Sequence, residues 1–395
     1  MAVSPKLQQQ IAEGGWIRKM FEAGIALKQK YGERNVFDLS LGNPVVEPPK
    51  EFVREIKHLV NEPDAGMHRY MPNAGYVETR TAVAEQLSKE TGLQFTANEV
   101  VMTCGAAGAL NVVLKTIIEA TDEIIIFSPY FVEYIYYIDN HQGVTVVVPT
   151  DSRFIPDLNL LEQNITPKTK AVLINSPNNP TGVVYSSDTL KDIGELLEKK
   201  EREYNREIFL ISDDVYRKII YDGLGCPYVF PYHERTIMTT SHSKDLALPG
   251  ERIGYIAVNP GYCDRQELMN GLTFCNRTLG FVNAPALMQH AVRVLQDVTV
   301  DIKQYEKKRD MLYENLCRMG YSVVKPQGAF YIFPKSPTND DMEFVNELQE
   351  YNVLIVPGKG FGAPGYFRIS YCMEDWVIEG SLEGFSKAAK KYGLP

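Results

Sequence analysis

Four short apolar runs, each followed by a polar turn, limit the folds open to this 395-residue chain more than any other feature. Helical patterns or long crossovers separate the runs, which cover residues 123–127, 171–175, 208–212 and 236–240. Strands that alternate with helices in this way favour a parallel sheet. Open α/β sheets bind their ligands beyond the carboxyl ends of the strands. We therefore predict an α/β fold with a mostly parallel sheet flanked by helices, and a ligand site at that edge of the sheet.

The turn after the last run carries a lysine between small hydroxyl residues. It reads Ser-His-Ser-Lys at residues 241–244, and Arg252 follows eight residues after Lys244. An amine becomes a nucleophile when burial or a nearby cation lowers its pKa. The hydroxyl of Ser241 and the planar fork of Arg252 are groups that bind phosphate well. These residues suit a reactive lysine beside a phosphate. An exposed turn lysine with a chance serine is the more common reading of Ser-x-Ser-Lys alone, and Arg252 narrows the difference between the two.

This stretch resembles the lysine signature of class I/II aminotransferases, which depend on pyridoxal phosphate (PLP) and share the aspartate aminotransferase-like PLP fold type I. The match lies at Ser241, Ser243, Lys244, Gly250, Arg252 and Gly254. It departs at His242, where that family usually has an apolar or aromatic residue. The resemblance extends from Leu39 to about Tyr371. It implies that Lys244 holds PLP as a Schiff base and moves the substrate proton as general base and acid, while Ser241, Ser243 and Arg252 bind the cofactor.

Two loops at other strand ends carry further cofactor residues by the same resemblance. A glycine-rich helix start directs free backbone N–H groups at a phosphate, which implies Gly105, Ala106 and Ala107 as donors. Close helix packing is the alternative for those small residues. In the aromatic cluster after residues 123–127, the resemblance places the ring of Phe131 against PLP, and core packing is the alternative.

Polar motifs follow two more strands. Asn-Pro-Thr-Gly at residues 179–182 resembles the family motif whose asparagine, here Asn179, binds the PLP ring oxygen and lies beside the substrate. Asp-Asp-Val-Tyr at residues 213–216 resembles the family's Asp-Glu-x-Tyr, with Asp214 where Glu is usual. The resemblance implies that Asp213 pairs with the protonated ring nitrogen and that Tyr216 donates to the ring oxygen. A helix N-cap is the alternative role for Asp214.

Two residues are implied to bind substrate, and two others have roles that depend on assembly or substrate class. Gly42 resembles the glycine whose amide touches the substrate carboxylate, with a plain turn glycine as the alternative. Arg368 resembles the arginine that clamps the α-carboxylate bidentately, with a surface arginine on an edge strand as the alternative. Tyr70 resembles the tyrosine that reaches the PLP phosphate of a neighbouring subunit. Arg277 is a hypothetical second cation for a dicarboxylate substrate.

The pattern of elements changes along the chain. After Asn283 helical patterns dominate, with short strands expected at 321–324 and 329–333. We predict a large PLP-binding domain over residues 49–285 and a smaller α+β domain from 286–395 and the N-terminal segment 1–48. Residues 1–33 are predicted to be helical and either cross a partner subunit or pack on their own domain. The apolar face of that helix comprises Ile11, Trp16, Ile17, Met20, Phe21, Ile25 and Leu27.

The amino-acid composition limits the classes of partner that we expect for this chain. A net charge of −9 argues against nucleic acid, and no apolar run reaches the roughly 18 residues of a membrane span. The six cysteines show no CxxC spacing, no Cys/His cluster has metal-ligand spacing, and no secretory signal is present, so we predict a cytoplasmic protein without a metal. The N-terminal helix, Tyr70 and the frequency of two-fold dimers predict a homodimer with shared active sites.

The resemblance implies a biosynthetic transaminase that exchanges an amino group between an L-amino acid and a 2-oxo acid. A carbon–sulfur β-lyase, another eliminating enzyme similar to ACC synthase, or a decarboxylase are alternatives on the same fold. A PLP-binding effector domain of a transcription regulator is a further alternative. Such regulators carry a basic helix-turn-helix domain ahead of the fold, and only about 35 residues precede the segment that starts at Leu39. The identity of the amino donor and the oxo-acid acceptor does not follow from the sequence.

Overall fold

The predicted parallel sheet is present, with strands in the order β2-β8-β7-β6-β5-β3-β4. A computed structural model describes the chain except for residues 1, 14 and 64, and within that part the sheet has seven strands. Their bounds are β2 (Val100–Thr103), β3 (Glu123–Ser128), β4 (Val144–Pro149), β5 (Thr169–Asn175), β6 (Phe209–Asp213), β7 (Thr236–Ser241) and β8 (Gly254–Val258). Four neighbouring pairs of strands are parallel, and β8 runs antiparallel to both of its neighbours, β2 and β7. The prediction of an α/β fold is confirmed.

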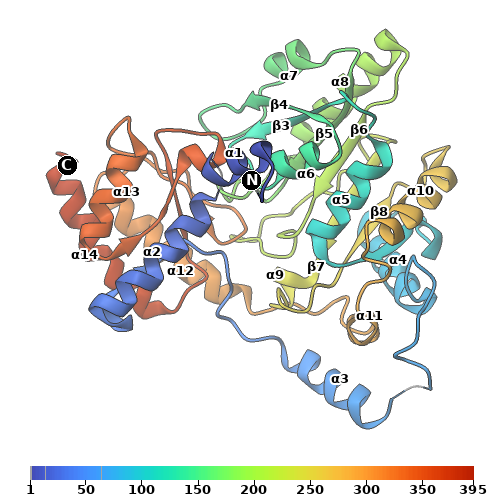
Figure 1. Cartoon of the computed structure of the whole chain (residues 1–395), viewed down its shortest axis with the longest axis horizontal. Coiled ribbons are helices and arrows are strands. Elements are labelled where there is room, and N and C mark those ends of the chain that lie inside the picture. The colour runs from blue at the N-terminus through green and yellow to red at the C-terminus, as the bar shows by residue number, and fades with distance from the viewer. Residues whose placement is uncertain (1, 14, 64) are drawn as a thin grey trace.

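Helices cover both faces of this sheet (Figure 1). Along β3, Ile124 and Ile126 pack with α5 and α10, whereas Ile125 and Phe127 pack with α7 and α8. Because both faces are buried, the strands are apolar throughout rather than alternating. The helices of this body are α3 (Lys50–Asn61), α4 (Val77–Thr91), α5 (Gly105–Ile117), α6 (Tyr134–Asn140), α7 (Leu158–Asn164), α8 (Ser187–Tyr204), α9 (His242–Asp245), α10 (Arg265–Thr278) and α11 (Ala286–Arg293).

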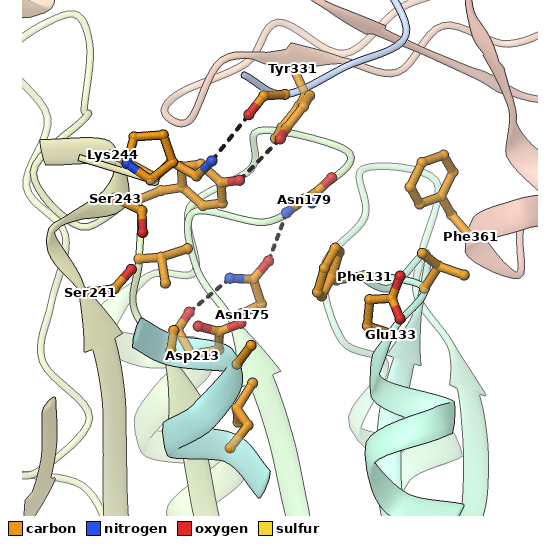
Figure 2. A pocket seen from close by; sticks show the side chains of 18 of the residues that line it. Phe131, Glu133, Asn175, Asn179, Asp213, Ser241, Ser243, Lys244, Tyr331 and Phe361 are labelled. Atoms are coloured by element: carbon orange, nitrogen blue, oxygen red, sulfur yellow. Dashed lines mark hydrogen bonds between the residues drawn. The ribbon is translucent and has the colours of Figure 1, made fainter. Parts of the chain in front are cut away.

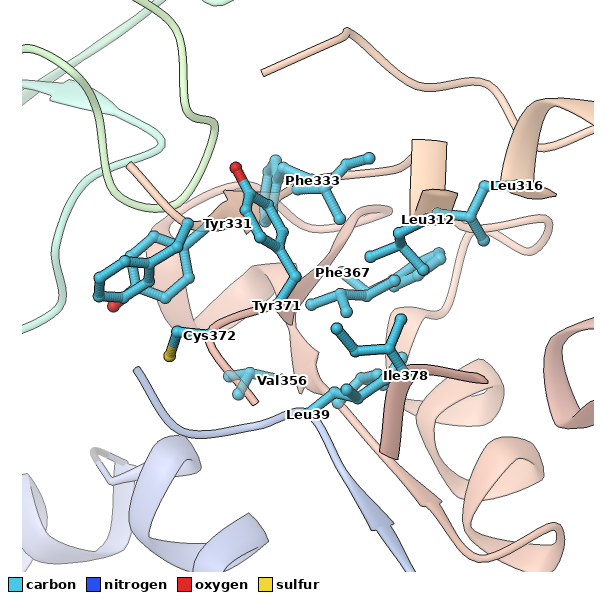
Figure 3. Packing of buried hydrophobic residues seen from close by; sticks show 14 of the residues in the cluster. Leu39, Leu312, Leu316, Tyr331, Phe333, Val356, Phe367, Tyr371, Cys372 and Ile378 are labelled. Atoms are coloured by element: carbon cyan, nitrogen blue, oxygen red, sulfur yellow. The ribbon is translucent and has the colours of Figure 1, made fainter. Parts of the chain in front are cut away.

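A second body combines the two ends of the chain. Strand β1 (Phe37–Asp38) pairs in parallel with β10 (Val353–Leu354), and Leu39 joins the apolar core shown in Figure 3. A separate three-stranded sheet has the order β11-β12-β9. The remaining elements of this body are β9 (Tyr331–Ile332), β11 (Val356–Pro357), β12 (Phe367–Ser370), α2 (Trp16–Tyr31), α12 (Ile302–Arg318), α13 (Asp341–Glu350), α14 (Asp375–Lys391) and the 3₁₀ helices Glu33–Asn35 and Gly358–Phe361. A further 3₁₀ helix, Ala97–Glu99, lies in the first body beside α4 and α10.

The N-terminal region differs from its prediction. It forms two helices, α1 (Pro5–Glu13) and α2, and Gly15 between them has a φ of 84°, which favours glycine. The chain by itself does not bury the whole predicted apolar face, since Ile11 is 63% and Ile25 is 44% exposed. The side chains of Trp16, Ile17 and Phe21 lie outside the described residues.

Both N-terminal helices contact their own chain. Lys6 of α1 forms a 2.6 Å ion pair with Asp139 of α6, and Gln10 donates to the same carboxylate. Met20 of α2 is buried in the core of the second body. The helices therefore connect the two bodies, with α1 at their junction in Figure 1.

One expectation about the C-terminal region was also wrong, because residues 321–324 form no strand. The alternative for Arg368, a surface arginine on an edge strand, is excluded. Strand β12 is the middle strand between β11 and β9, and Arg368 is only 1% exposed. Within the part of the chain that the structure describes, no helix is both long and apolar enough to cross a membrane.

Candidate active site

A cavity of about 550 Å³ opens where the carboxyl ends of β5, β6 and β7 face the second body. Figure 2 shows Lys244 and the two serines on one side, and Phe131 with Phe361 on the other. Twelve residues that the sequence singled out line it: Gly42, Ala106, Ala107, Phe131, Asn179, Asp213, Tyr216, Ser241, Ser243, Lys244, Arg252 and Arg368. The strand ends therefore converge as the parallel topology requires.

Lys244 lies on the single turn of α9, directly after β7. Its Nζ donates a 3.1 Å hydrogen bond to the carbonyl of Gly42, from the opposite body. Burial lowers the pKa of this amine to about 8, and the positive charges of Arg368 and Arg252 lower the pKa in the same direction. Roughly a tenth of the Lys244 amine is therefore unprotonated, and nucleophilic, at pH 7, far more than for an ordinary lysine.

Asp213 ends β6 with one carboxylate oxygen satisfied and the other open. Tyr134 donates a 2.6 Å hydrogen bond to Oδ2, whereas the buried Oδ1 has no hydrogen-bond partner among the described residues. Burial raises the pKa of this carboxyl to about 7, against the hydrogen bond from Tyr134, which lowers the pKa. A buried, unsatisfied carboxylate oxygen is costly unless a ligand meets it. Asp213 is therefore arranged to receive a cationic N–H group.

Arg368, on β12 of the second body, is held in a fixed orientation by its hydrogen bonds and ring contacts. Its Nη1 donates to Asn179 Oδ1 at 3.1 Å and its Nη2 to the carbonyl of Ser40 at 2.6 Å. The guanidinium stacks over the rings of Tyr331 and Phe361, at 4.5 and 4.8 Å from their centroids. The buried Nε has no partner among the described residues. This rigid fork can bind a carboxylate.

A chain of amides fixes Asn179 between Arg368 and the sheet. The backbone N–H of Asn179 donates to Asn175 Oδ1 at 2.7 Å, and Asn175 Nδ2 donates to the carbonyl of Asp213 at 2.7 Å (Figure 2). Because Oδ1 of Asn179 accepts from Arg368, its Nδ2 is the group left to donate into the cavity.

Tyr216 approaches Asn179 from the end of the next strand. Its hydroxyl lies 3.1 Å from that of Tyr331, and the two rings meet edge to face. Asp214, next in the motif, forms an ion pair of 2.9 Å with Arg217 and precedes a turn, not a helix, so the N-cap alternative is wrong.

Small residues and one arginine form the predicted phosphate corner. Gly105 begins α5 with a φ of 72°, and a Cβ added there would lie 2.9 Å from Arg252 Nη2. Gly254 also leaves no room for a side chain, because its added Cβ would lie 3.0 Å from Cβ of Ser241. The close approach brings the arginine, Ser241 and the start of α5 together as a set of anion donors.

Three residues of interest lie away from the cavity. Gly105 does not line it, although its neighbours Ala106 and Ala107 do. Tyr70 is 93% exposed and Arg277 is exposed on α10, so neither reaches the cavity of its own chain. The unexpected His242 is buried, with Nδ1 at 3.2 Å from Asp245 Oδ2.

The sequence reasoning missed several residues of the site. Tyr134, Asn175 and Tyr331 orient the predicted residues, and Glu133 and Phe361 line the cavity. The position of Asn175 at the end of a predicted strand was a usable signal. Tyr331 carried none, since it reaches the site from a distant part of the chain.

A cavity at the ends of parallel strands that is lined by a buried lysine and an aspartate with an unpartnered oxygen defines a fold type I enzyme site. The chain belongs to the aminotransferase class I and II family, whose members depend on PLP; residues 34–383 match that family. It is an aminotransferase.

Relatives and solved structures agree with this assignment. A probable aspartate aminotransferase of Methanocaldococcus jannaschii is 34% identical, over 87% of this chain and 91% of that protein. Aromatic-amino-acid aminotransferase 2 of Thermococcus litoralis is 31% identical over the full length of both chains. The crystal structure of an amino transferase from Eubacterium rectale is 42% identical, with a TM-score of 0.96 over 99% of each chain.

Proposed function

We propose that the cavity binds PLP and that Lys244, Asp213 and Arg368 perform the transfer of an amino group from an L-amino acid to a 2-oxo acid. The observation that carries this proposal is the presence, in one cavity, of the Lys244 amine with its lowered pKa and the unpartnered Oδ1 of Asp213. The Lys244 amine can form a covalent bond with the aldehyde of PLP, and Asp213 Oδ1 can accept a hydrogen bond from the protonated ring nitrogen.

The remaining residues fit the other parts of the cofactor. Arg252, Ser241 and Ser243, with the backbone N–H groups at the start of α5 (Gly105, Ala106 and Ala107), would hold the phosphate. Asn179 Nδ2 and the hydroxyl of Tyr216 would donate to the ring oxygen, and Phe131 would lie against the ring.

Bound PLP supplies an electron sink for the carbanion that forms at the substrate Cα. Lys244 Nζ would act as the general base that accepts the substrate Cα proton and as the general acid that returns a proton. Arg368 holds the α-carboxylate, and Gly42 closes over it from the second body. The same steps in reverse return the amino group to a 2-oxo acid.

The assembly and the domain division belong to the same proposal. Tyr70 is exposed and lies away from the cavity of its own chain, as expected if its side chain reaches the PLP phosphate of a partner subunit. This role requires a homodimer with shared sites. We place the large domain at 49–285 and the small domain at 1–48 and 286–395, although α11 packs on α3 and α4. The protein would act in the cytoplasm, in amino-acid biosynthesis.

Family membership does not fix the side chain of the substrate. One relative named above is an aspartate aminotransferase and the other an aromatic one, at similar identity. Aspartate and aromatic amino acids are therefore the first donors to test, with both mono- and dicarboxylic 2-oxo acids as acceptors.

Lys244→Ala tests the proposal. Purified with PLP, the variant should lack the absorbance band of the lysine-bound cofactor and nearly all turnover, while Lys218→Ala, a lysine on the nearby loop, should keep both. Wild type given an amino acid alone should convert its cofactor to the pyridoxamine form. Release of ammonia and pyruvate, or of carbon dioxide, would instead indicate a lyase or a decarboxylase.

A further inference from the structure

One charged side chain of the cavity has no part in the chemistry above. Among the described residues, the charged side chains that line the cavity are Lys244, Arg252, Arg368, Asp213 and Glu133. The proposed function assigns the first four to the cofactor or the α-carboxylate. Glu133 is left, on the wall that carries Phe131 and across the cavity from Lys244 (Figure 2).

Glu133 has no structural role that would explain it. It occupies the N-cap position of α6, yet its side chain makes no capping hydrogen bond. No described residue forms a hydrogen bond or ion pair with its carboxylate, whereas Asp139 on the same helix is paired with Lys6. Burial raises the pKa of the Glu133 carboxyl, and no cation among the described side chains offsets the lost hydration. A half-buried, unpaired acid in a ligand cavity suits a ligand that brings the cation.

The surroundings of Glu133 define the rest of that ligand. Tyr137, one turn further along α6, lines the same cavity, as do Val356 and Phe361. These groups would contact an apolar stem. A second carboxylate on the substrate would meet Glu133 as a like charge, with each of the three lining cations already occupied.

We propose that Glu133 selects amino donors whose side chain ends in a cation, an ammonium or a guanidinium group, on an aliphatic stem. This inference rests on the proposed function, because it takes Lys244 and Arg368 as the groups that fix the other end of the substrate. Glu133 is then the residue that gives the enzyme its donor class.

Ligands without an α-amino group test binding separately from turnover. Three are matched in chain length: δ-guanidinovalerate carries a cation, hexanoate is neutral at that end, and adipate carries a second carboxylate. On the PLP-loaded wild type, calorimetry should show δ-guanidinovalerate binding about tenfold more tightly than hexanoate, the order expected of a charge-assisted contact, and adipate binding most weakly. In Glu133→Gln the advantage of the guanidinium should disappear.

Kinetics supply the second measurement. The ratio of kcat/KM for arginine to that for norleucine should fall by about tenfold in Glu133→Gln. Glu119→Gln, which removes an exposed carboxylate outside the cavity, should leave the ratio at the wild-type value. An unchanged cofactor absorbance band and melting temperature show that Glu133→Gln retains the fold.

Two results would overturn the inference: ratios that are equal in wild type and Glu133→Gln, or tighter binding of adipate than of δ-guanidinovalerate. Failure of the proposed function looks different. There, no donor of the panel would be turned over by wild type, and the binding series would still decide the role of Glu133.

Discussion

The ring of Tyr331 fills the space beside Gly42, so that a Cβ added to the glycine would lie 2.8 Å from Cζ of Tyr331 and would overlap its hydroxyl. The two residues come from opposite ends of the chain. Their contact leaves the Gly42 carbonyl free to accept a hydrogen bond from Lys244 Nζ. It also keeps the Tyr331 hydroxyl beside the hydroxyl of Tyr216. Through this contact the second body determines the orientation of the Lys244 side chain.

Gly42→Ala should therefore damage both stability and substrate binding. Tyr331 is buried and stacked on Arg368, so it cannot yield without moving the carboxylate clamp. We expect a loss of about 1–3 kcal/mol in the free energy of unfolding, as for other overpacked sites, and a raised KM for the amino acid. Denaturant melts and steady-state kinetics measure these. Gly225→Ala is the matched control, because no atom lies within 4 Å of its added Cβ; equal behaviour of the two variants would contradict the prediction.

The pKa of Asp213 predicts how the stability of the cofactor-free protein depends on pH. Burial raises this pKa to about 7 in the folded chain, above the value of 3.8 for a free aspartate, so the folded state holds the proton longer. The stability contributed by protonation is present at low pH and is lost as pH rises through about 7. Relative to Asp213→Asn, wild type should lose on the order of 2–3 kcal/mol between pH 5 and 7 and then level off. Tyr134→Phe, which removes a bond to the charged form, should move the end of this decline to higher pH. If the free energy of unfolding changes with pH in the same way in wild type and Asp213→Asn, the prediction for Asp213 is wrong.

The lowered pKa of Lys244 predicts the pH dependence of cofactor binding. Condensation with an aldehyde needs the unprotonated amine, so the rate of PLP capture by cofactor-free protein should rise with pH and level off above about 8. Arg368→Gln removes a charge that lowers this pKa and should shift the profile to higher pH. Stopped-flow absorbance measures the rate. Coincident profiles for the two proteins would show that burial alone sets the pKa.

Arg368→Lys should separate substrate binding from cofactor binding. Lysine cannot reproduce the bidentate fork or its stacking on Tyr331 and Phe361. We expect KM for amino acids to rise by roughly a hundredfold, with the cofactor absorbance unchanged. Arg277→Ala, which removes an arginine outside the cavity, is the variant to compare with Arg368→Lys. If acidic and aromatic donors react at the same rates in Arg277→Ala and in wild type, Arg277 has no selective role.

Tyr70 should complete the site of a partner subunit. Tyr70→Phe should weaken PLP retention by about tenfold and leave the dimer intact, whereas Tyr31→Phe, a second exposed tyrosine, should not. Mixed dimers of Lys244→Ala and Tyr70→Phe chains would hold one site with both defects and one with neither. At limiting PLP, mixing should restore activity up to one good site per dimer. A monomer, or no recovery in proven heterodimers, would remove Tyr70 from the site.

The sequence by itself determined the parallel sheet and most of the site. Apolar strands separated by helices have few alternatives to parallel pairing, and that pairing brings Asp213, Asn179 and Lys244 to one edge. Local chemistry, such as the Asn-Pro-Thr-Gly turn, is readable from residues that are neighbours in the chain.

Only the tertiary structure decided which buried polar groups of the site have no hydrogen-bond partner. That Tyr134 takes one oxygen of Asp213 and leaves the other open, or that Tyr331 closes on Gly42, depends on contacts between distant segments. The same holds for Glu133, whose isolation is visible only when every neighbour is placed. Burial and pairing are properties of the packed chain, because a pKa and a hydrogen-bond partner are set by what surrounds a side chain in space and not by its position in the sequence.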